Sequence, residues 1–180
     1  DGIRDYKVTG VQTCALPICE PLNTEQALLM TPAACSLGAV GERAVPQILA
    51  VIGEPPMPDL VETPEDPKSS ARVHAFKALA RTQTANAEVP HVIINTLATQ
   101  DTNWKHLRGP AAEAAGILKI HEAVPALIAV LEDKTDKNID ERTRLDVILA
   151  LGELRDPRAI KPLLAYIGKN WTTQIGRAHV

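Results

Sequence analysis

The chain has 180 residues, enough for one domain with a sizeable core; hydrophobic residues make up 45% of it and aromatic residues only 3%. A core of Ala, Leu, Ile and Val is typical of helical repeats and argues against a β-sandwich or barrel. The formal net charge of −3 argues against a nucleic-acid-binding protein, and no uninterrupted apolar run reaches the ~20 residues of a membrane span.

Both ends of the chain resemble translated sequencing-adapter DNA. Residues 1–18, DGIRDYKVTGVQTCALPI, match adapter codons apart from a two-residue index, and residues 175–180, IGRAHV, match the start of the opposite adapter. Segments of this kind are left out of a fold prediction. We therefore expect the natural sequence to span about residues 19–174, as a fragment of a longer protein from an assembled sequence. Its compartment is unknown, with the cytoplasm as the default.

One helical pattern recurs four times between the two ends. Each copy contains a Val or Ile followed by apolar residues three, four and seven positions later, on one face of an α-helix, except that Thr96 breaks the pattern in the second copy. The copies begin at Ala44-Val45-Pro46, Glu88-Val89-Pro90, Ala123-Val124-Pro125 and Ala159-Ile160-Lys161-Pro162. A small residue precedes each copy, near the end of an earlier helix, at Gly38, Ala80, Gly116 and Gly152. The pattern predicts helical hairpins, which stack because one hairpin cannot bury its own apolar face.

In chain order, we expect repeats at about residues 24–53, 69–100, 102–133 and 140–169. Residues 53–68 carry five Pro and five acidic residues, a composition that excludes regular structure. We interpret them as a surface loop, because insertions in repeat arrays map to loops. The later repeats open after residues suited to helix N-caps, at Ser69-Ser70, Asp101-Thr102 and Asp140.

The clearest hairpin is Arg144 to Ile167, RLDVILALGELRDPRAIKPLLAYI. Two amphipathic helices flank a short break in which Asp156 suits an N-cap. Pro157 suits the first helical turn, where its missing N–H costs nothing.

This order of residues resembles the HEAT-repeat family, most closely its short phycobilisome-lyase-like subclass. The shared pattern is an Arg, an Ala-rich helix ending in Leu-Gly, a short turn, Ala-Val-Pro and a Leu-rich helix. Residues 144–167 and 111–133 match it best, and the resemblance covers about residues 24–169. The first repeat departs from it, with Met30 at the Arg position, and so does the second, with a longer turn. The resemblance implies an all-α, right-handed α-solenoid of about four hairpins, of the armadillo/HEAT-like kind.

Three arginines, Arg72, Arg108 and Arg144, recur 36 residues apart, one in each of the last three repeats. They could form a basic stripe for phosphate or acidic peptides. Alternatively, each ties neighbouring repeats together by pairing with an acid or a carbonyl in the preceding turn, where Asp66, Asp101 and Asp136 stand. We favour the structural role, because the repeats alternate in charge and a nucleic-acid groove needs several cations on one face.

The resemblance places the second helices on the concave side of the array. The face that these helices turn toward the groove is predicted to carry small and partly apolar side chains. Such a surface suits a helix or an extended segment of another protein. The alternative is that its Ala and Val residues pack against adjacent repeats. The candidate partner-binding residues are Gln47, Val51, His91, Asn95, Val130, Lys161 and Tyr166.

We predict no catalytic, cofactor-binding or metal-ligating residues. Residues 19–174 contain no His-Glu-x-x-His motif, no Cys pair with metal spacing and no Gly-rich phosphate loop. His74 and His121 are interpreted as structural or surface residues. Asp146 and Trp104 are the only material for a glycosylase-like site, and they stand on different repeats.

The function predicted from these features is a non-catalytic scaffold that binds another protein or a peptide segment, and not nucleic acid. One alternative is a regulatory or sensor module of a larger chain with a catalytic domain. Another is a HEAT-like enzyme that acts as a bilin lyase or a DNA glycosylase. Because repeat arrays need polar caps on their end repeats, we also expect this chain to be less stable than its parent protein, or prone to associate through its ends.

Overall fold

The computed structural model describes residues 25–53, 67–101, 104–133 and 141–177, with side chains described for residues 32–53, 70–101, 104–133 and 141–168. Within these ranges every regular element is helical. The α-helices are α1 (Glu25–Val40), α2 (Val45–Gly53), α3 (Pro67–Arg81), α4 (Glu88–Ala98), α5 (Arg108–Ile117), α6 (Val124–Glu132), α7 (Glu141–Leu154) and α8 (Ile160–Arg177). Short 3-10 helices precede four of them, at η1 (Gly41–Ala44), η2 (Lys105–Leu107), η3 (His121–Ala123) and η4 (Pro157–Ala159).

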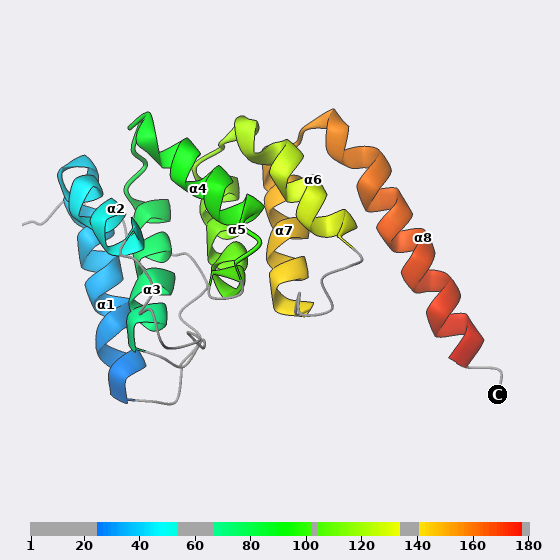
Figure 1. Ribbon diagram of the computed structural model, residues 1–180, viewed down its shortest axis with the longest axis horizontal. Helices are drawn as coiled ribbons and strands as arrows, with labels where there is room; N and C mark the ends of the chain where they lie inside the picture. Colours follow the sequence, from blue (N-terminus) through cyan, green and yellow to red (C-terminus); the bar gives the residue numbers. More distant parts are fainter. Residues whose placement is uncertain (1–24, 54–66, 102–103, 134–140, 178–180) are drawn as a thin grey trace, which may run out of the picture.

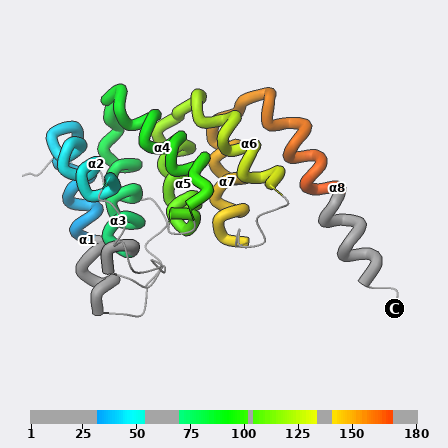
Figure 2. The backbone as a smooth tube through the Cα atoms, viewed as in Figure 1, coloured from blue at the N-terminus to red at the C-terminus, as the bar shows by residue number. Residues whose placement is uncertain are grey.

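The helices form two layers along one axis (Figure 1). The first helices of the hairpins stack in the order α1, α3, α5, α7, and α4, α6 and α8 follow one another in the second layer. Each second helix also packs on the first helix of the next hairpin, as α2 does on α3, α4 on α5 and α6 on α7. Figure 2 shows the backbone path alternating between the layers. The predicted all-α solenoid of stacked hairpins is confirmed.

The core is built from small and branched aliphatic side chains. Helices α2, α4 and α6 each carry a Val in their first two positions, at Val45, Val89 and Val124, and each of these is at most 2% exposed. Helix α5 packs between α3 and α7. Its alanines are fully buried, namely Ala111, Ala112, Ala114 and Ala115. Methyl-sized side chains let helix axes come close, so dispersion contacts replace the aromatic packing that the composition lacks.

The closest helix contacts involve glycine near the ends of first helices. A Cβ added to Gly116 would lie 2.9 Å from the Cα of Ala150 on α7. A Cβ added to Gly38 would lie 2.5 Å from the Cβ of Arg81 on α3. At Gly152, the matching position of the last hairpin, an added Cβ meets nothing within 4 Å. The glycines predicted at this position therefore allow a first helix to approach the first helix of the next hairpin, where the structure describes one.

The turns after the first helices share one backbone conformation. Gln83, Lys119 and Arg155 stand 36 residues apart, and each has a positive φ, of 48°, 57° and 51°. At Lys119 the Ile120 N–H donates to the Ala115 carbonyl at 3.0 Å and the Lys119 N–H donates to the Gly116 carbonyl at 3.3 Å. This pair of hydrogen bonds is the Schellman helix ending, in which one residue adopts the left-handed conformation.

The last turn confirms the predicted helix cap. The Asp156 carboxylate accepts a hydrogen bond from the Arg158 backbone N–H at 2.8 Å, and Pro157 opens η4. The Arg158 guanidinium donates to the same carboxylate, with Nη2 at 2.7 Å from Oδ2. These bonds satisfy an N–H that would otherwise lack an intrahelical partner.

The start of α3 corrects one sequence expectation. Residues 53–68 were expected to hold no regular structure, but Gly53 ends α2 while Pro67 and Lys68 belong to α3. Proline is favourable in the first turn of a helix, which explains why α3 begins before Ser69. Residues 54–66 and the predicted connector at 134–140 lie outside the described residues.

One segment of the described residues, Pro32–Gly53, is long and apolar enough to cross a membrane by length and composition. It is not one straight helix, because Gly41, with a φ of +72°, and η1 turn the chain between α1 and α2. Buried helices of soluble proteins have the same composition, so the segment does not show a membrane span.

The glycine contacts predict opposite effects for the same substitution at two matched positions. Gly116→Ala should lower the free energy of unfolding by about 1–3 kcal/mol, because the new methyl group meets the α7 backbone. Gly152→Ala should raise it by about 0.5–1 kcal/mol, because alanine favours the helix and the space is open. Urea unfolding of both variants measures the difference, and equal effects would refute the role of Gly116 in helix contact.

The Asp156 cap predicts a pH dependence of stability. Hydrogen bonds from the Arg158 side chain and then from its backbone N–H lower the pKa of Asp156 from 3.8 to about 2. Because the folded-state pKa lies below the unfolded one, this carboxylate contributes stability above pH 3.8 that is lost as the pH falls toward 2. Asp156→Asn keeps an acceptor without the charge. Its deficit in free energy of unfolding should therefore shrink between pH 5 and pH 2, and a deficit independent of pH would count against the assignment.

Candidate partner-binding site

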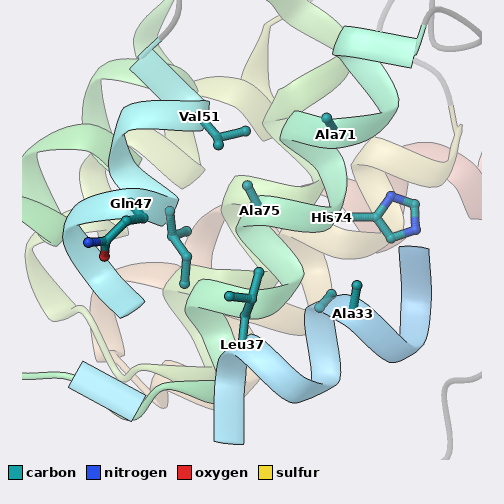
Figure 3. A pocket seen from close by; sticks show the side chains of 9 residues that line it. Ala33, Leu37, Gln47, Val51, Ala71, His74 and Ala75 are labelled. Carbon is teal, nitrogen blue, oxygen red and sulfur yellow. The ribbon is translucent and has the colours of Figure 1, made fainter. Parts of the chain in front are cut away.

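Helices α1, α2 and α3 enclose a pocket of about 220 Å³ that opens to the surface. In Figure 3 the Val51 side chain points from α2 toward α3, and Leu37 rises from α1 between them. The pocket exists because the α1 and α3 walls carry methyl groups where larger side chains would fill the space. Its lining residues are Ala33, Ala34, Leu37, Gln47, Ile48, Val51, Ala71, His74 and Ala75.

Two polar side chains accompany this apolar lining. Gln47 is exposed on α2. His74 is only 8% exposed, and its Nδ1 lies 2.7 Å from the Ser70 carbonyl. Since a carbonyl only accepts, Nδ1 carries a proton and donates to it, and the buried Nε2 has no hydrogen-bond partner among the described residues. The accessible surface of the pocket is therefore almost wholly apolar, and His74 Nε2 is buried.

The structure brings together two of the predicted partner-binding residues at this pocket. Gln47 and Val51 stand one turn apart on α2, and both line it. His91 and Asn95 have the same spacing on α4 and are exposed. On α8, Lys161 is exposed and Tyr166 is half-buried against the core. The α2 pair lines the pocket between α1, α2 and α3, and the residues on α4 and α8 are not part of its lining.

Val130 corrects the prediction for the α6 face. It was expected to be available to a partner, but it is 4% exposed. Helix α6 packs against α4 on one side and α7 on the other, and this packing turns Val130 inward. Val130 therefore contributes to the core and does not contact a partner.

Sequence reasoning missed the contribution of the first helices to the pocket. Leu37, Ala71 and Ala75 come from α1 and α3, whereas the prediction considered only the second helices. The spacing of Ala71 and Ala75, four residues apart, was the available signal. This spacing alone does not predict a pocket, because alanines one turn apart are compatible with a close helix contact and with a gap.

Burial removes two of the three recurring arginines from any surface stripe. Arg72 is 1% exposed, and its guanidinium carbon lies 4.8 Å from the centre of the Trp104 ring, a cation–π contact between the second and third hairpins. Arg108 is 2% exposed and donates from Nη2 to the Thr99 carbonyl in the preceding turn. Arg144 is half-buried.

The acids suggested for these arginines are only partly described. Asp66 and Asp136, the suggested partners of Arg72 and Arg144, lie outside the described residues. Thr99 and Trp104 take part in the contacts above, and neither was named as a partner. The inter-repeat role of the arginines therefore rests on the Arg108–Thr99 and Arg72–Trp104 contacts.

No group of three His, Cys, Asp or Glu side chains is placed to hold a metal ion in the part of the chain that the structure describes. Asp146 lies 3.4 Å from Arg142 on the same helix, and Trp104 contacts Arg72. Both residues of the glycosylase alternative are thus engaged in contacts within the array.

Two comparisons with known proteins bear on this geometry. Residues 143–168, which span most of α7 and the first half of α8, match the family model of the PBS lyase HEAT-like repeat. A stretch of 58 residues is 48% identical to the Bilin biosynthesis protein PecE of Nostoc sp. (strain PCC 7120 / SAG 25.82 / UTEX 2576). That match covers 32% of this chain and 21% of PecE, so the chain aligns with about a fifth of that relative.

The buried arginines predict unequal losses of stability. Arg108→Ala should lower the free energy of unfolding by about 2–3 kcal/mol, because the Thr99 carbonyl loses a charged donor and the core loses a packed stem. Arg144→Ala, at the matching but half-buried position, should cost less. Thermal and urea unfolding measure both variants, and a greater loss for Arg144 would contradict the assignment.

Proposed function

Because this chain carries HEAT-like repeats of the PBS lyase type, we propose that it is a protein-binding scaffold that does not itself catalyse a reaction. The observation that carries the proposal is the apolar pocket between α1, α2 and α3. It holds one apolar side chain of a partner segment lying across α2 and α4.

The size of the pocket supports a side chain over a whole small molecule. Small-molecule sites usually measure ~300–1,000 Å³, whereas this pocket measures about 220 Å³. Burying one Leu- or Phe-sized side chain contributes roughly 1.5–3 kcal/mol, the scale of an interface hot spot. The methyl groups of Ala71 and Ala75 on α3 form one wall for such an anchor, and Ala33 and Ala34 on α1 form another.

The polar groups around the pocket support an oriented peptide. Gln47, which lines the pocket, and His91 and Asn95, which are exposed on α4, provide hydrogen-bond donors and acceptors on the second helices. An apolar centre with a polar margin is the usual composition of a protein interface.

A bilin-related role is the second candidate, because a stretch of this chain is 48% identical to a protein named for bilin biosynthesis. The small pocket volume weighs against a site for an entire tetrapyrrole in the described residues. Cys35, on α1, is the one free thiol among them and is half-buried outside the pocket lining. The scaffold role therefore has more support.

Peptides selected by phage display against the full chain provide the test. Ala71→Phe fills the pocket and should weaken binding of the selected peptides about tenfold or more, measured by fluorescence anisotropy. The matched control is Ala129→Phe on the exposed face of α6, which should leave binding unchanged. Thermal unfolding checks that both variants remain folded.

Two results would contradict the scaffold proposal. Selected peptides that bind the Ala71→Phe variant as tightly as the parent chain would remove the pocket from the interface. A bilin that binds the chain with a shifted absorption spectrum, and that competes with no peptide, would favour the second candidate.

A further inference from the structure

Apolar positions that are buried in the first three hairpins are exposed in the fourth. Ile160 is 57% exposed, whereas Val45, Val89 and Val124 at the same repeat position are at most 2% exposed. Ile167 is 61% exposed, whereas its counterparts Ile52 and Leu131 are 1% and 9% exposed. With Leu164, which is 62% exposed, these two isoleucines form a stripe along one side of α8.

The missing burial has a structural cause. In the earlier hairpins the first helix of the next hairpin covers each second helix, as α3 covers α2, α5 covers α4 and α7 covers α6. Figure 1 shows α8 at the end of the array, with no first helix beyond it among the described residues. The exposed stripe is thus the continuation of an interface that the molecule already forms three times.

The end of α7 offers the matching close contact. Gly116 receives Ala150 of the next first helix, and Gly38 receives Ala78 and Arg81 in the same register. Gly152 occupies the corresponding place on α7, and an added Cβ there meets nothing within 4 Å. It therefore leaves room for the backbone of one more helix.

A charged group stands beside this contact in each of the last two hairpins. Lys119 Nζ lies 2.6 Å from the Glu153 carboxylate and 2.8 Å from the Glu153 carbonyl, which joins the third hairpin to the end of α7. Arg155 follows Lys119 by 36 residues, has nearly the same positive φ and is exposed. Arg155 thus stands at the repeat position of Lys119. An acidic side chain on an incoming helix would pair with it as Glu153 pairs with Lys119.

We propose that the end face, defined by Gly152, Arg155, Ile160, Leu164 and Ile167, docks the first helix of a further HEAT-like repeat. The incoming helix is amphipathic, with an alanine over Gly152 and an acidic side chain at Arg155. Helix α7 has this chemistry, since it presents Ala150 to Gly116 and Glu153 to Lys119. This face is separate from the α1–α3 pocket and does not depend on the scaffold proposal.

A peptide of residues 141–154 serves as the probe, because it reproduces α7. An isolated helix of this length is marginal in water, so a hydrocarbon staple replaces Leu145 and Leu149, which are exposed on α7. The fluorescein-labelled peptide should bind the full chain saturably in fluorescence anisotropy. Hydrogen exchange should show new protection in α7 and α8.

Two variants of the full chain locate the contact. In the Gly152→Leu variant the leucine side chain occupies the space of the incoming helix, so binding should weaken about tenfold or more. The melting temperature of this variant should stay the same or rise, because nothing in the chain lies within 4 Å of the new Cβ and leucine favours the helix. Arg155→Glu should weaken binding about threefold, and a peptide with Arg at the Glu153 position should restore it. The charge swap tests the face even if Gly152→Leu fails to fold.

Three outcomes would overturn the inference. The peptide does not bind, or it binds the parent chain and both variants alike. The third is self-association of the full chain in sedimentation velocity that the Gly152→Leu substitution abolishes, which would assign the face to a second copy of this chain instead.

Discussion

The contact between Gly116 and Ala150 is the constraint on which the rest of this array depends. Helix α5 meets α7 backbone to backbone at this point, and its alanines continue the approach along the helix. With so few aromatic side chains, the hairpins gain packing energy only if their axes come this close. The spacing between first helices then sets the position of every second helix, and so determines which apolar positions are covered.

The sequence predicted the architecture well, because the 36-residue spacing and the helical periodicity act together. The Val or Ile near the start of each second helix, the small residue before it and the Asp156 cap all have local causes that are visible in the chain. The start of α3 was misjudged, because proline ends a helix when it lies inside one but favours a helix when it lies in the first turn. Pro67 looks the same in the sequence in either case.

The candidate site was less predictable, because it depends on how three helices sit together. Alanines such as Ala71 and Ala75 are compatible with a tight contact or with a gap, and only the placement of α1 and α2 makes a pocket there. Val130 lies at the border between the covered and open sides of α6, where a small rotation of the helix decides burial. The Arg72–Trp104 contact joins residues 32 positions apart, beyond any local pattern.

The left-handed residues at Gln83, Lys119 and Arg155 are not glycines, and this has a consequence for the order of the hairpins. A glycine would make the turn with less strain, but it would leave every junction chemically identical. The first turn uses a glycine, Gly41, whereas each later turn carries a different side chain: an amide, a lysine that pairs with Glu153, and an arginine. Hairpins of nearly the same shape can thus be told apart, which discourages skipped or exchanged neighbours as the chain assembles.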